Sequence, residues 1–406
     1  MSKKRILIIG INSRPEFTGI GRYTGEMLTW LAGQGHEVTM VTAYPYYPYW
    51  KIQKPYSGWL YKKETPMPGL TLYRCPLYVP SVPTGLKRMI HEGTFFMSAF
   101  LVVVKLLFKR RYDTVFTIAP PFHLGFLALF YRFFKGSPIV YHLQDLQIDA
   151  AKELGILKSG PLFSVLFNLE KFILKKADIV TTISIGMHER ILNKIRRPVV
   201  LFPNWVDTNL YHPVRERDNL KRRWGFLPED KLVVYAGSIG EKQGLDMLLH
   251  IAATLGTHKQ IKFIICGTGP FKEKLAALAI ELGLNNVFFF PLQGDDVFND
   301  FLNIADVHLV LQKGDAGDLV MPSKLTTILS IGGLAIATAN PGTTLYEVIT
   351  ANQMGIIVSP DNELELSNAI VDCFEYDHSQ KRINARNFAE HNLNKDVILN
   401  KLSTYL

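Results

Sequence analysis

Cysteine is scarce in this sequence, and the few cysteines lie far apart. Among 406 residues there are three, Cys75, Cys266 and Cys373, and no C-x-x-C pair is present. An odd number of widely separated thiols supports neither a disulfide framework nor a structural zinc site. This pattern favours a protein of a reducing compartment.

Long apolar runs are missing as well. No stretch reaches the roughly 18 uninterrupted apolar residues that a membrane-spanning helix needs. The first residues are basic, but the apolar run after them, residues 5–9, has only the length of a strand and leads to no cleavage site. A secretory signal is therefore not expected. We predict a cytoplasmic protein that is not integral to the membrane.

The motifs typical of dinucleotide-binding sites and of metal-binding sites are also absent. No G-x-G-x-x-G follows the first strand directly, and the second expected strand ends in Thr42 and Ala43 without an acidic residue for a ribose hydroxyl. A nicotinamide enzyme is therefore disfavoured. The sequence has no D-x-D and no cluster of histidines and carboxylates at metal spacing. Any bound diphosphate must then be neutralised by lysine, arginine and helix N-termini, and no metal cofactor is expected.

The chain is basic, but only its first half has a net positive charge. Residues 1–200 hold 27 lysines and arginines against 12 acidic residues, whereas the remainder holds 18 against 24. A positive field on one half indicates that this half meets an anionic partner. Nucleic acid, a membrane surface and a phosphorylated acceptor all fit, although no nucleic-acid recognition motif is present.

A strand, a glycine-rich turn and a helix follow one another twice in the chain. Residues 5–9 lead into a turn from Gly10 to Gly21, and residues 232–236 lead into a turn from Gly237 to Gly244. Continuous β-branched runs are typical of parallel strands that are covered on both faces. Glycines at the carboxyl end of such strands let backbone N–H groups approach an anion. Two units of this kind, facing across a cleft, suit a phosphate-bearing ligand and a second substrate.

The remaining pattern agrees with an α/β protein of two parallel-sheet domains. A length of 406 residues is best divided into two domains. Strands alternate with helical segments, such as 18–34 and 162–176, and the Pro-bearing, charge-rich stretch 198–223 is the expected linker. The expected strands are 5–9, 37–42, 114–118, 138–142 and 179–183 in the first half, and 232–236, 262–266, 287–290, 307–311, 334–338 and 356–358 in the second.

The second half contains the most informative candidate site. In the segment 315–325, Ser323 and Lys324 follow a strand and begin a helix, where free N–H groups and an ammonium can converge on a phosphate. An N-capped surface helix with an incidental lysine is the alternative. The turn that contains Gly240 and Lys242 lies on a neighbouring strand end, which favours the phosphate site. Gly267 and its neighbours are best explained as a structural corner.

In the first half, His142 and Asp145 lie where a strand gives way to a loop. Side chains at the carboxyl ends of parallel strands carry chemistry, and either group can accept a proton from an incoming hydroxyl. The alternative is a buried, hydrogen-bonded histidine beside a capping aspartate.

Two further segments concern partners. Residues 95–111 have apolar residues at helical spacing and a basic end, which suits either a helix in a membrane interface or a core helix. Residues 44–50 form an aromatic loop, Tyr-Pro-Tyr-Tyr-Pro-Tyr-Trp. This loop either stacks on sugar rings or is a rigid packed turn.

Several short motifs together point to one family. They include two glycine turns, two segments that lead into strands and two segments that contain a lysine. The two lysine-containing segments, Gly240 to Leu245 and Pro322 to Leu325, are the most specific. The segments are Thr18 to Gly21, Gly35 to Val38, Pro45 to Pro48, Arg74 to Pro80, Phe202 to Trp205, Gly240 to Leu245, Gly267 to Pro270, Ala305 to Asp306 and Pro322 to Leu325.

Over essentially its whole length the chain resembles the glycosyltransferases of family four, which are retaining enzymes of the GT-B architecture with two Rossmann-like domains. The resemblance implies an acceptor-binding domain over residues 1–203, a nucleotide-sugar-binding domain over 204–385 and a C-terminal helix, 386–406, that packs back toward the first domain. It is strongest to members that act in bacterial exopolysaccharide (colanic-acid-like) synthesis. This implies GDP-fucose as donor and a lipid-linked oligosaccharide as acceptor at the inner face of the plasma membrane.

Two positions depart from the family pattern. The usual arginine after the first strand of the second domain is Ser238, and Thr327 stands where a glutamate usually holds the donor ribose. In the family this glutamate is the second of two, in the motif E-x7-E. Near the position of the first glutamate, the only acidic residues are Asp315 and Asp318. The departure leaves diphosphate binding to Lys242 and Lys324.

The expected reaction is metal-independent transfer with retention. A nucleotide-sugar epimerase of the same architecture and a family-four transferase using a UDP-sugar in O-antigen or capsule synthesis remain alternatives. A two-lobed periplasmic binding protein is disfavoured by the unpaired cysteines. The expected catalytic residues are Asp145, His142, Lys242 and Lys324, and the expected donor-binding residues are Gly19, Gly21, Asn204, Gly240, Gln243, Gly267, Gln293, Asp318, Ser323 and Lys324.

Overall fold

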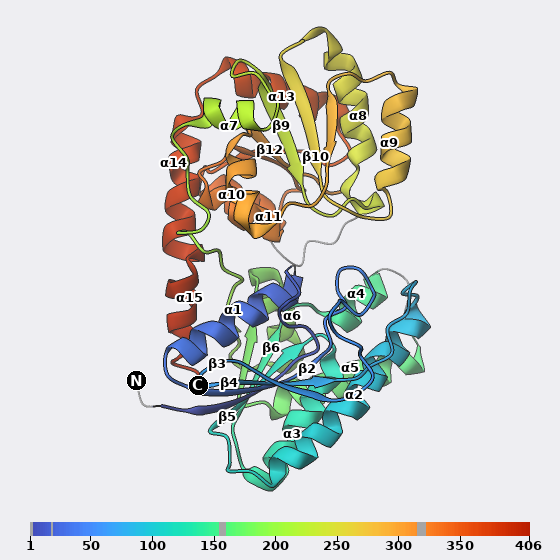
Figure 1. Ribbon diagram of the computed structural model, residues 1–406, viewed down its shortest axis with the longest axis vertical. Helices are drawn as coiled ribbons and strands as arrows, with labels where there is room; N and C mark the ends of the chain where they lie inside the picture. The colour runs from blue at the N-terminus through green and yellow to red at the C-terminus, as the bar shows by residue number, and fades with distance from the viewer. Residues whose placement is uncertain (1–2, 18, 154–159, 315–321) are drawn as a thin grey trace. The chain divides into compact units, whose positions relative to one another are not determined.

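The computed structural model of the protein describes residues 3–17, 19–153, 160–314 and 322–406. The chain folds into two compact units. Unit 1 contains residues 1–204 and 399–406, and unit 2 contains residues 205–398. Each unit has its own sheet, as Figure 1 shows for the blue-to-green and the yellow-to-red parts of the chain.

Unit 1 is built on an eight-stranded sheet in which seven strands are parallel. Ile8 at its centre pairs with Met40 on one side and Phe116 on the other, and both neighbours are buried. Only the edge strand β3 runs antiparallel. The strand order is β3 (Lys62–Met67), β4 (Leu70–Cys75), β2 (Glu37–Ala43), β1 (Arg5–Ile9), β5 (Thr114–Ala119), β6 (Ile139–Leu143), β7 (Ile179–Thr182) and β8 (Val200–Leu201).

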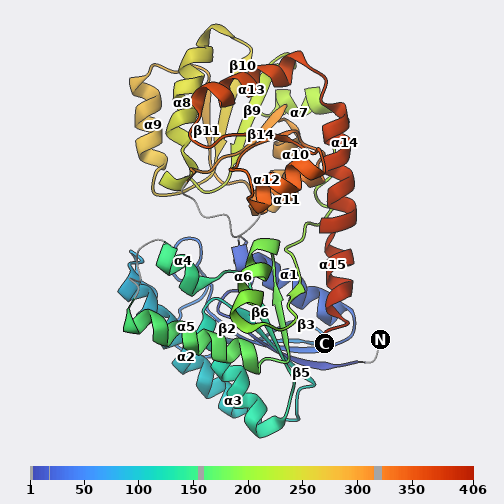
Figure 2. The ribbon, with the colours of Figure 1, turned by 180° about the vertical axis from the view of Figure 1, so that it is seen from behind.

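Helices cover both faces of this sheet. In Figures 1 and 2, α2, α3 and α5 lie on one face and α1 on the other. Helix α6 packs against α5, where Lys194 Nζ donates to Glu170 Oε2 at 2.6 Å. The last residues of α15 (Lys395–Leu402) belong to this unit, where Thr114 Oγ1 donates to the carbonyl of Leu406 at 2.7 Å. The other helices are α1 (Gly19–Gly33), α2 (Gly85–Leu107), α3 (Gly125–Lys135), α4 (Gln147–Glu153), α5 (Pro161–Lys176) and α6 (Ile185–Ile195), with a 3₁₀ turn at Phe122–Leu124.

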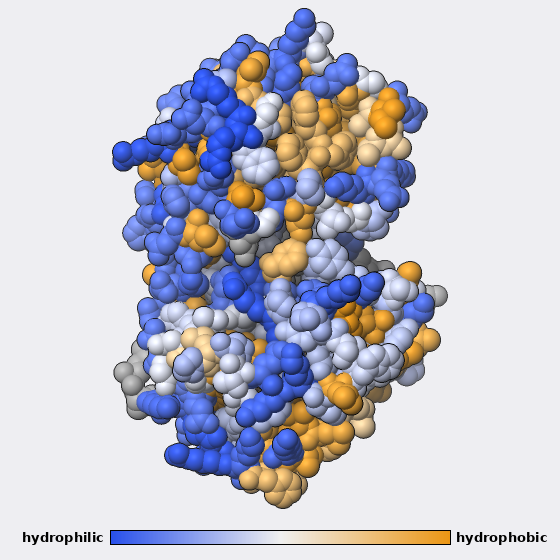
Figure 3. All heavy atoms as spheres, in the orientation of Figure 1, coloured by the Kyte–Doolittle hydropathy of each residue, from blue (hydrophilic) through white to orange (hydrophobic). Residues whose placement is uncertain are grey.

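Helix α2 is buried along one side and exposed along the other. Phe95, Ala99 and Val103 are buried at a spacing of four residues, which places them on one face of the helix. The opposite face exposes Met97 and Leu101, and Figure 3 shows hydrophobic side chains gathered over the region of α2 and α3. Within the described residues, α2 is the one helix long and apolar enough to cross a membrane, with a mean hydropathy of 1.6 in a window that is 33% buried. As the connection between β4 and β5 it also packs on the sheet.

Unit 2 contains a six-stranded sheet that is entirely parallel. Alternate residues of its central strand β9 pack on opposite faces of the sheet. Val233 and Tyr235 pack with α8, α9 and α13, whereas Leu232 and Val234 pack on the other face. A strand buried on both sides needs a continuous apolar sequence. The order is β11 (Val287–Phe290), β10 (Ile261–Cys266), β9 (Lys231–Ala236), β12 (Val307–Val310), β13 (Ala335–Thr338) and β14 (Ile356–Val358).

The helices of unit 2 also form two layers. Those opposite α8, α9 and α13 include α11 and α14, which pack together. Short 3₁₀ or π turns lie at Glu241–Gln243, Leu255–Thr257 and Ala389–Leu393. The helices are α7 (Arg217–Arg223), α8 (Leu245–Thr254), α9 (Lys272–Glu281), α10 (Asp295–Asn303), α11 (Ser323–Ser330), α12 (Thr344–Ala351), α13 (Glu363–Glu375) and α14 (Ser379–Phe388).

The predicted α/β class and the parallel strands of both halves are confirmed. Three strands, β3, β4 and β8, were not predicted. The helix expected at 95–111 instead spans Gly85–Leu107, so Lys109 to Arg111 lie beyond its end. The stretch 198–223, expected as a linker, contains β8 and the helix α7, which is anchored in unit 2 by Lys221 bonded to Asp306 at 2.8 Å.

Candidate functional site

The turns at the carboxyl edge of the unit 2 sheet pack closely on one another. A Cβ atom at Gly267 would lie 1.9 Å from the carbonyl oxygen of Gly237, and one at Gly269 would lie 2.1 Å from that of Ile239. The N–H of Ile239 donates to Thr268 at 2.9 Å. The turns after β9 and β10 therefore need glycine because their backbones touch, as expected of a structural corner at Gly267.

Lys324 lies at the centre of this edge. It is the second residue of α11, as predicted, and its side chain lies against Gly237, 3.0 Å from the position a Cβ atom would take there. The Lys324 ammonium lies 3.9 Å from the centre of the Tyr235 ring. Burial lowers the pKa of Lys324 to about 7. No hydrogen bond or ion pair joins its Nζ to any residue that the structure describes.

A half-buried ammonium without a carboxylate partner is costly unless an anion binds it. The aromatic ring of Tyr235 supplies part of the compensation, because a cation is attracted to the face of a π-system. The first turn of α11 adds backbone N–H groups that have no partner within the helix. This arrangement is suited to a phosphate group.

Two more lysines lie on the neighbouring turns. Lys242 is exposed in the short turn after β9, and its carbonyl accepts the N–H of Lys313 at 2.9 Å, which joins the turns after β9 and β12. The Lys313 side chain passes over Gly244, 3.5 Å from the position of a Cβ atom there. β9 and β12 are neighbours in the sheet. Through Gly237 and Lys242, the turn after β9 therefore contacts both Lys324 at the start of α11 and Lys313.

Lys313 and Lys272 were not singled out from the sequence. Lys272 begins α9 and donates to the carbonyl of Gly267 at 3.1 Å. The only sequence feature that marks Lys313 and Lys272 is their position within a few residues of the carboxyl end of a strand. Many surface lysines share that signal, so it could not have selected them.

The side chains of two other predicted donor-binding residues in unit 2 form hydrogen bonds with the backbone of their own turns. The Gln243 amide oxygen accepts the N–H of Gly240 at 3.0 Å, and the Gln293 amide donates to the Pro291 carbonyl at 2.7 Å. Ser323 is exposed at the start of α11. Asp315 and Asp318 lie outside the described residues.

The position of the family's ribose-binding glutamate is filled by a buried hydroxyl. Thr327 Oγ1 donates to the carbonyl of Lys324 at 2.9 Å and is 5% exposed. It therefore stabilises the first turn of α11.

In unit 1, the predicted glycine turn lies at the start of α1 beside a buried carboxylate. Gly19 has φ +57°, a left-handed conformation that favours glycine. A Cβ atom at Gly21 would lie 2.6 Å from Glu16. Glu16 accepts the N–H groups of Tyr46 and Tyr47, both at 2.9 Å, and burial raises its pKa. Glu16, for which the sequence pattern gave no signal, thus fixes the aromatic loop to the turn after β1.

His142 has the environment of a core residue. It lies inside β6, is 2% exposed, and its Nδ1 is 2.8 Å from Thr181 Oγ1. Phe116 and Phe202 flank the ring, and burial lowers the pKa of His142 to about 3. The imidazole is therefore neutral at physiological pH, which agrees with the alternative of a buried, hydrogen-bonded histidine.

The two other predicted residues lie at the ends of unit 1 strands. Asp145 is half-buried between β6 and α4. Asn204 is the last residue of the first segment of unit 1, and its Oδ1 is buried without a hydrogen-bond partner in the described part of the chain.

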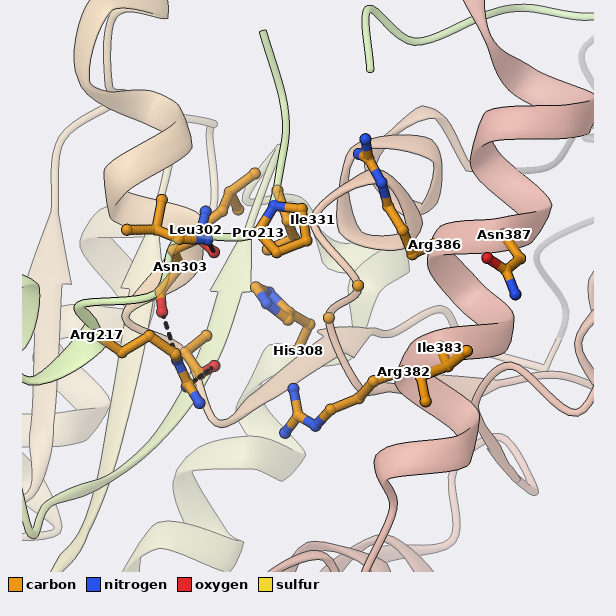
Figure 4. A pocket seen from close by; sticks show the side chains of 14 residues that line it. Pro213, Arg217, Leu302, Asn303, His308, Ile331, Arg382, Ile383, Arg386 and Asn387 are labelled. Atoms are coloured by element: carbon orange, nitrogen blue, oxygen red, sulfur yellow. Dashed lines mark hydrogen bonds between the residues drawn. The ribbon is translucent and has the colours of Figure 1, made fainter. Parts of the chain in front are cut away.

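A separate pocket of about 380 Å³ lies at the opposite, amino edge of the unit 2 sheet. Figure 4 shows His308, at the start of β12, among Arg217, Arg382 and Arg386. These guanidinium groups donate to backbone carbonyls, for example Arg217 Nε to Asn303 at 2.9 Å. Ligands of parallel sheets bind outside the carboxyl ends of the strands. The lysine-bearing edge, and not this pocket, is the candidate site.

The described residues of the candidate site supply cations. Among the described residues no group of three histidines, cysteines or carboxylates could hold a metal ion. The ammonium groups and the helix start can stabilise negative charge on a diphosphate leaving group without reorganising, because they are already in place.

Two family models cover most of the chain. The glycosyl transferase 4-like domain matches residues 18–205, and the glycosyl transferases group 1 domain matches residues 216–389. The chain is 38% identical over 405 residues to the putative colanic acid biosynthesis glycosyl transferase WcaI of Escherichia coli strain K12. That match covers 97% of this chain and 98% of the relative.

Solved structures share the complete fold. Sucrose-phosphate synthase from Thermosynechococcus elongatus superposes with a TM-score of 0.76 at 17% identity, covering 99% of this chain and 98% of that one. The lipopolysaccharide glycosyltransferase WaaG has a TM-score of 0.70 at 16% identity, covering 98% and 99%. Anabaena HepE in complex with UDP-glucose has a TM-score of 0.69 at 14% identity, covering 99% of each chain. The fold is therefore GT-B, and the chain belongs to the family of glycosyltransferases with a 4-like N-terminal domain and a group 1 C-terminal domain.

Proposed function

We propose that this glycosyltransferase moves a sugar from a nucleotide-sugar donor to a lipid-linked oligosaccharide acceptor in the synthesis of a colanic-acid-like exopolysaccharide. The full-length similarity to WcaI supports the exopolysaccharide role. GDP-fucose is our first choice of donor on the same resemblance. The transfer proceeds with retention and without a metal ion.

One observation carries the donor site, namely the Lys324 ammonium at the first turn of α11. It is enclosed by Gly237 and Tyr235 and has no anionic partner among the described residues. Bond cleavage at the anomeric carbon leaves both bonding electrons on the diphosphate. Lys324 neutralises that charge, with Lys242 as a second, exposed cation. Removing one such stabilising group typically lowers the rate by about 10²–10³.

The acceptor side belongs to unit 1 in this proposal. Its excess of positive charge and the exposed apolar side of α2 favour peripheral binding at the anionic inner face of the plasma membrane. A lipid-linked acceptor would be presented at that surface.

A thermal-shift panel of GDP, UDP, ADP, dTDP and their sugars tests the donor. A ligand that binds only the folded protein raises its stability by RT ln(1 + [L]/Kd), so we expect one nucleotide series to shift the unfolding midpoint selectively. The same series is then measured with EDTA and with added Mg²⁺. Absence of any shift would refute the donor site, and a shift that requires Mg²⁺ would refute metal independence.

The stereochemistry needs a separate measurement. With the preferred donor and an acceptor, proton NMR of the first product formed reports its anomeric configuration. We expect the configuration of the donor, and an inverted product would rule out retention. Donor consumption without an acceptor, giving an epimerised sugar nucleotide, would instead support the epimerase alternative.

A further inference from the structure

Unit 1 contains a large aromatic groove that the donor chemistry does not use. Its volume is about 1420 Å³, which is above the 300–1,000 Å³ usual for sites of small ligands. Three segments line it, namely the loop after β2, the loop after β4 and one side of α2. The lining residues are Tyr49 to Ile52, Lys54, Tyr56 to Trp59, Tyr61, Pro76 to Val79, Ser81, Gly93, Thr94, Met97, Ser98 and Leu101.

The groove lies where a parallel sheet is expected to bind its ligand. β2 ends at Ala43 and β4 ends at Cys75, so both lining loops leave the carboxyl edge of the unit 1 sheet. α2 then continues away from that edge. The part of α2 that lines the groove, from Gly93 to Leu101, extends roughly 12 Å at 1.5 Å per residue. The groove is therefore elongated along the helix.

Hydrogen bonds hold its walls in place. Tyr61 Oη donates to the carbonyl of Ser98 at 3.1 Å, which ties the loop after β2 to α2. The N–H of Tyr78 donates to Thr94 Oγ1 at 3.0 Å, which ties the loop after β4 to the same helix. A wall that is already ordered loses little conformational entropy when a ligand binds.

The surface of the groove is apolar along the helix and cationic at the loop. Met97 and Leu101 are 63% and 60% exposed, and Trp59 on the rim is 84% exposed. Large apolar side chains exposed together are typical of a binding surface. Lys51 and Lys54 are exposed on the loop, and no aspartate or glutamate is among the described residues that line the groove. The charge complements an anion attached to an apolar chain.

We propose that this groove binds the lipid part of the acceptor, an isoprenoid chain joined to a phosphate. The chain lies along Met97 and Leu101, and the phosphate lies near Lys51 and Lys54. This inference rests on the proposed lipid-linked acceptor and assigns it a site.

Binding of a fluorescent farnesyl phosphate, followed by anisotropy without detergent or vesicles, tests the groove. Leu101→Glu places a carboxylate in the groove, and we expect it to weaken binding at least tenfold. Met89→Glu is the matched control, because Met89 is 57% exposed on the same helix and does not line the groove. It should change the affinity less than twofold. Trp59→Ala is a second groove variant that should weaken binding without altering a buried residue.

Competition identifies the part of the ligand that is recognised. Unlabelled farnesol should displace the probe, whereas inorganic phosphate alone or a soluble oligosaccharide should not. In these binding experiments, three results would overturn the proposal: no binding by the wild-type protein, equal loss in Leu101→Glu and Met89→Glu, or displacement by the oligosaccharide but not by farnesol. The last result would make the groove a saccharide site.

The groove and the proposed function can fail separately. Transfer to a lipid-linked acceptor that is equal in Leu101→Glu and in the wild type would overturn the groove alone. Probe binding with the expected variant pattern, but no sugar transfer with any donor and lipid acceptor, would overturn the proposed function and leave the groove.

Discussion

At the scale of single residues, Lys324 has an environment unlike that of a surface lysine. The aromatic ring and the glycine turn lie against its half-buried ammonium, and burial favours the neutral amine. An anion beside the ammonium reverses that preference, because it favours the charged form. Ligand binding and protonation at this side chain are therefore coupled.

Lys324→Ala should lower the rate of transfer by about 10²–10³ while leaving the fold unchanged. The side chain makes no hydrogen bond or ion pair with described residues, so its removal breaks no such bond and loses only the contacts with Tyr235 and Gly237. Steady-state kinetics and the unfolding midpoint measure the two effects. Lys259→Ala, an exposed lysine elsewhere in unit 2, is the control. Undiminished turnover in Lys324→Ala would disprove the phosphate role.

The pH dependence of donor binding should follow the same group. In the free protein the pKa of Lys324 is about 7, so the ammonium is present below this pH and is progressively lost above it. Affinity for a nucleoside diphosphate should therefore fall as pH rises above 7, by up to about tenfold per pH unit. Titration calorimetry from pH 6 to 9 measures the fall.

Lys324→Arg is the control for this dependence, because arginine stays protonated throughout that range. Its affinity should be flat with pH. A wild-type affinity that stays constant between pH 6 and 9 would contradict the coupling.

The lowered pKa of Lys324 gives the folding stability of the ligand-free protein the opposite pH dependence to that of nucleotide affinity. The lysine pKa is about 7 when folded and 10.5 in its ordinary state, so between these values the unfolded chain binds more protons. Stability then rises with pH across this interval. Lys324 destabilises the empty protein at low pH, where its ammonium binds phosphate best, and the ligand removes this cost.

At the scale of elements, the carboxyl edge of unit 2 depends on turns that touch through their backbones. Cβ atoms at Gly267 and Gly269 would overlap carbonyl groups of the turn after β9. This packing sets the position of the Gly237 backbone against which the Lys324 side chain lies. A change in the corner should therefore affect both stability and the donor site.

Gly269→Ala should destabilise the protein by about 1–3 kcal/mol, since an added methyl group forces the backbone of Ile239 to move. Chemical denaturation measures the loss, and nucleotide affinity should weaken in parallel. Gly256→Ala is the matched control, because a Cβ atom there would meet nothing within 4 Å. If Gly269→Ala proves as stable as this control, the turns are not in contact as described.

At the scale of the whole molecule, the two halves of the chain carry opposite net charge. The first 200 residues have an excess of lysine and arginine, and the remainder has an excess of aspartate and glutamate. In our proposal the first half meets an anionic bilayer and the second a soluble donor.

Flotation with vesicles that contain anionic lipid should recover the protein at low salt and release it at high salt, since screening weakens each charge. Reversing two exposed lysines of α2, Lys87→Glu with Lys105→Glu, should weaken binding at least about tenfold at roughly 1 kcal/mol per basic residue. Lys259→Glu with Lys274→Glu in unit 2 is the matched control. Failure to float at low salt would contradict membrane binding.

Sequence alone determined the parallel strands, the start of α11 and the family, because buried strands and glycine turns leave local patterns. It missed β3 because β3, with the sequence KKETPM, is a largely exposed edge strand without an apolar pattern. It also missed β4, although the sequence LTLYRC is largely buried. Only the tertiary structure decided which polar residues face a ligand. His142 and Lys324 are both polar residues near a strand or helix boundary in the sequence. Packing encloses His142 between two rings, whereas it leaves the Lys324 ammonium without an anionic partner among the described residues, because burial depends on neighbours distant in the chain.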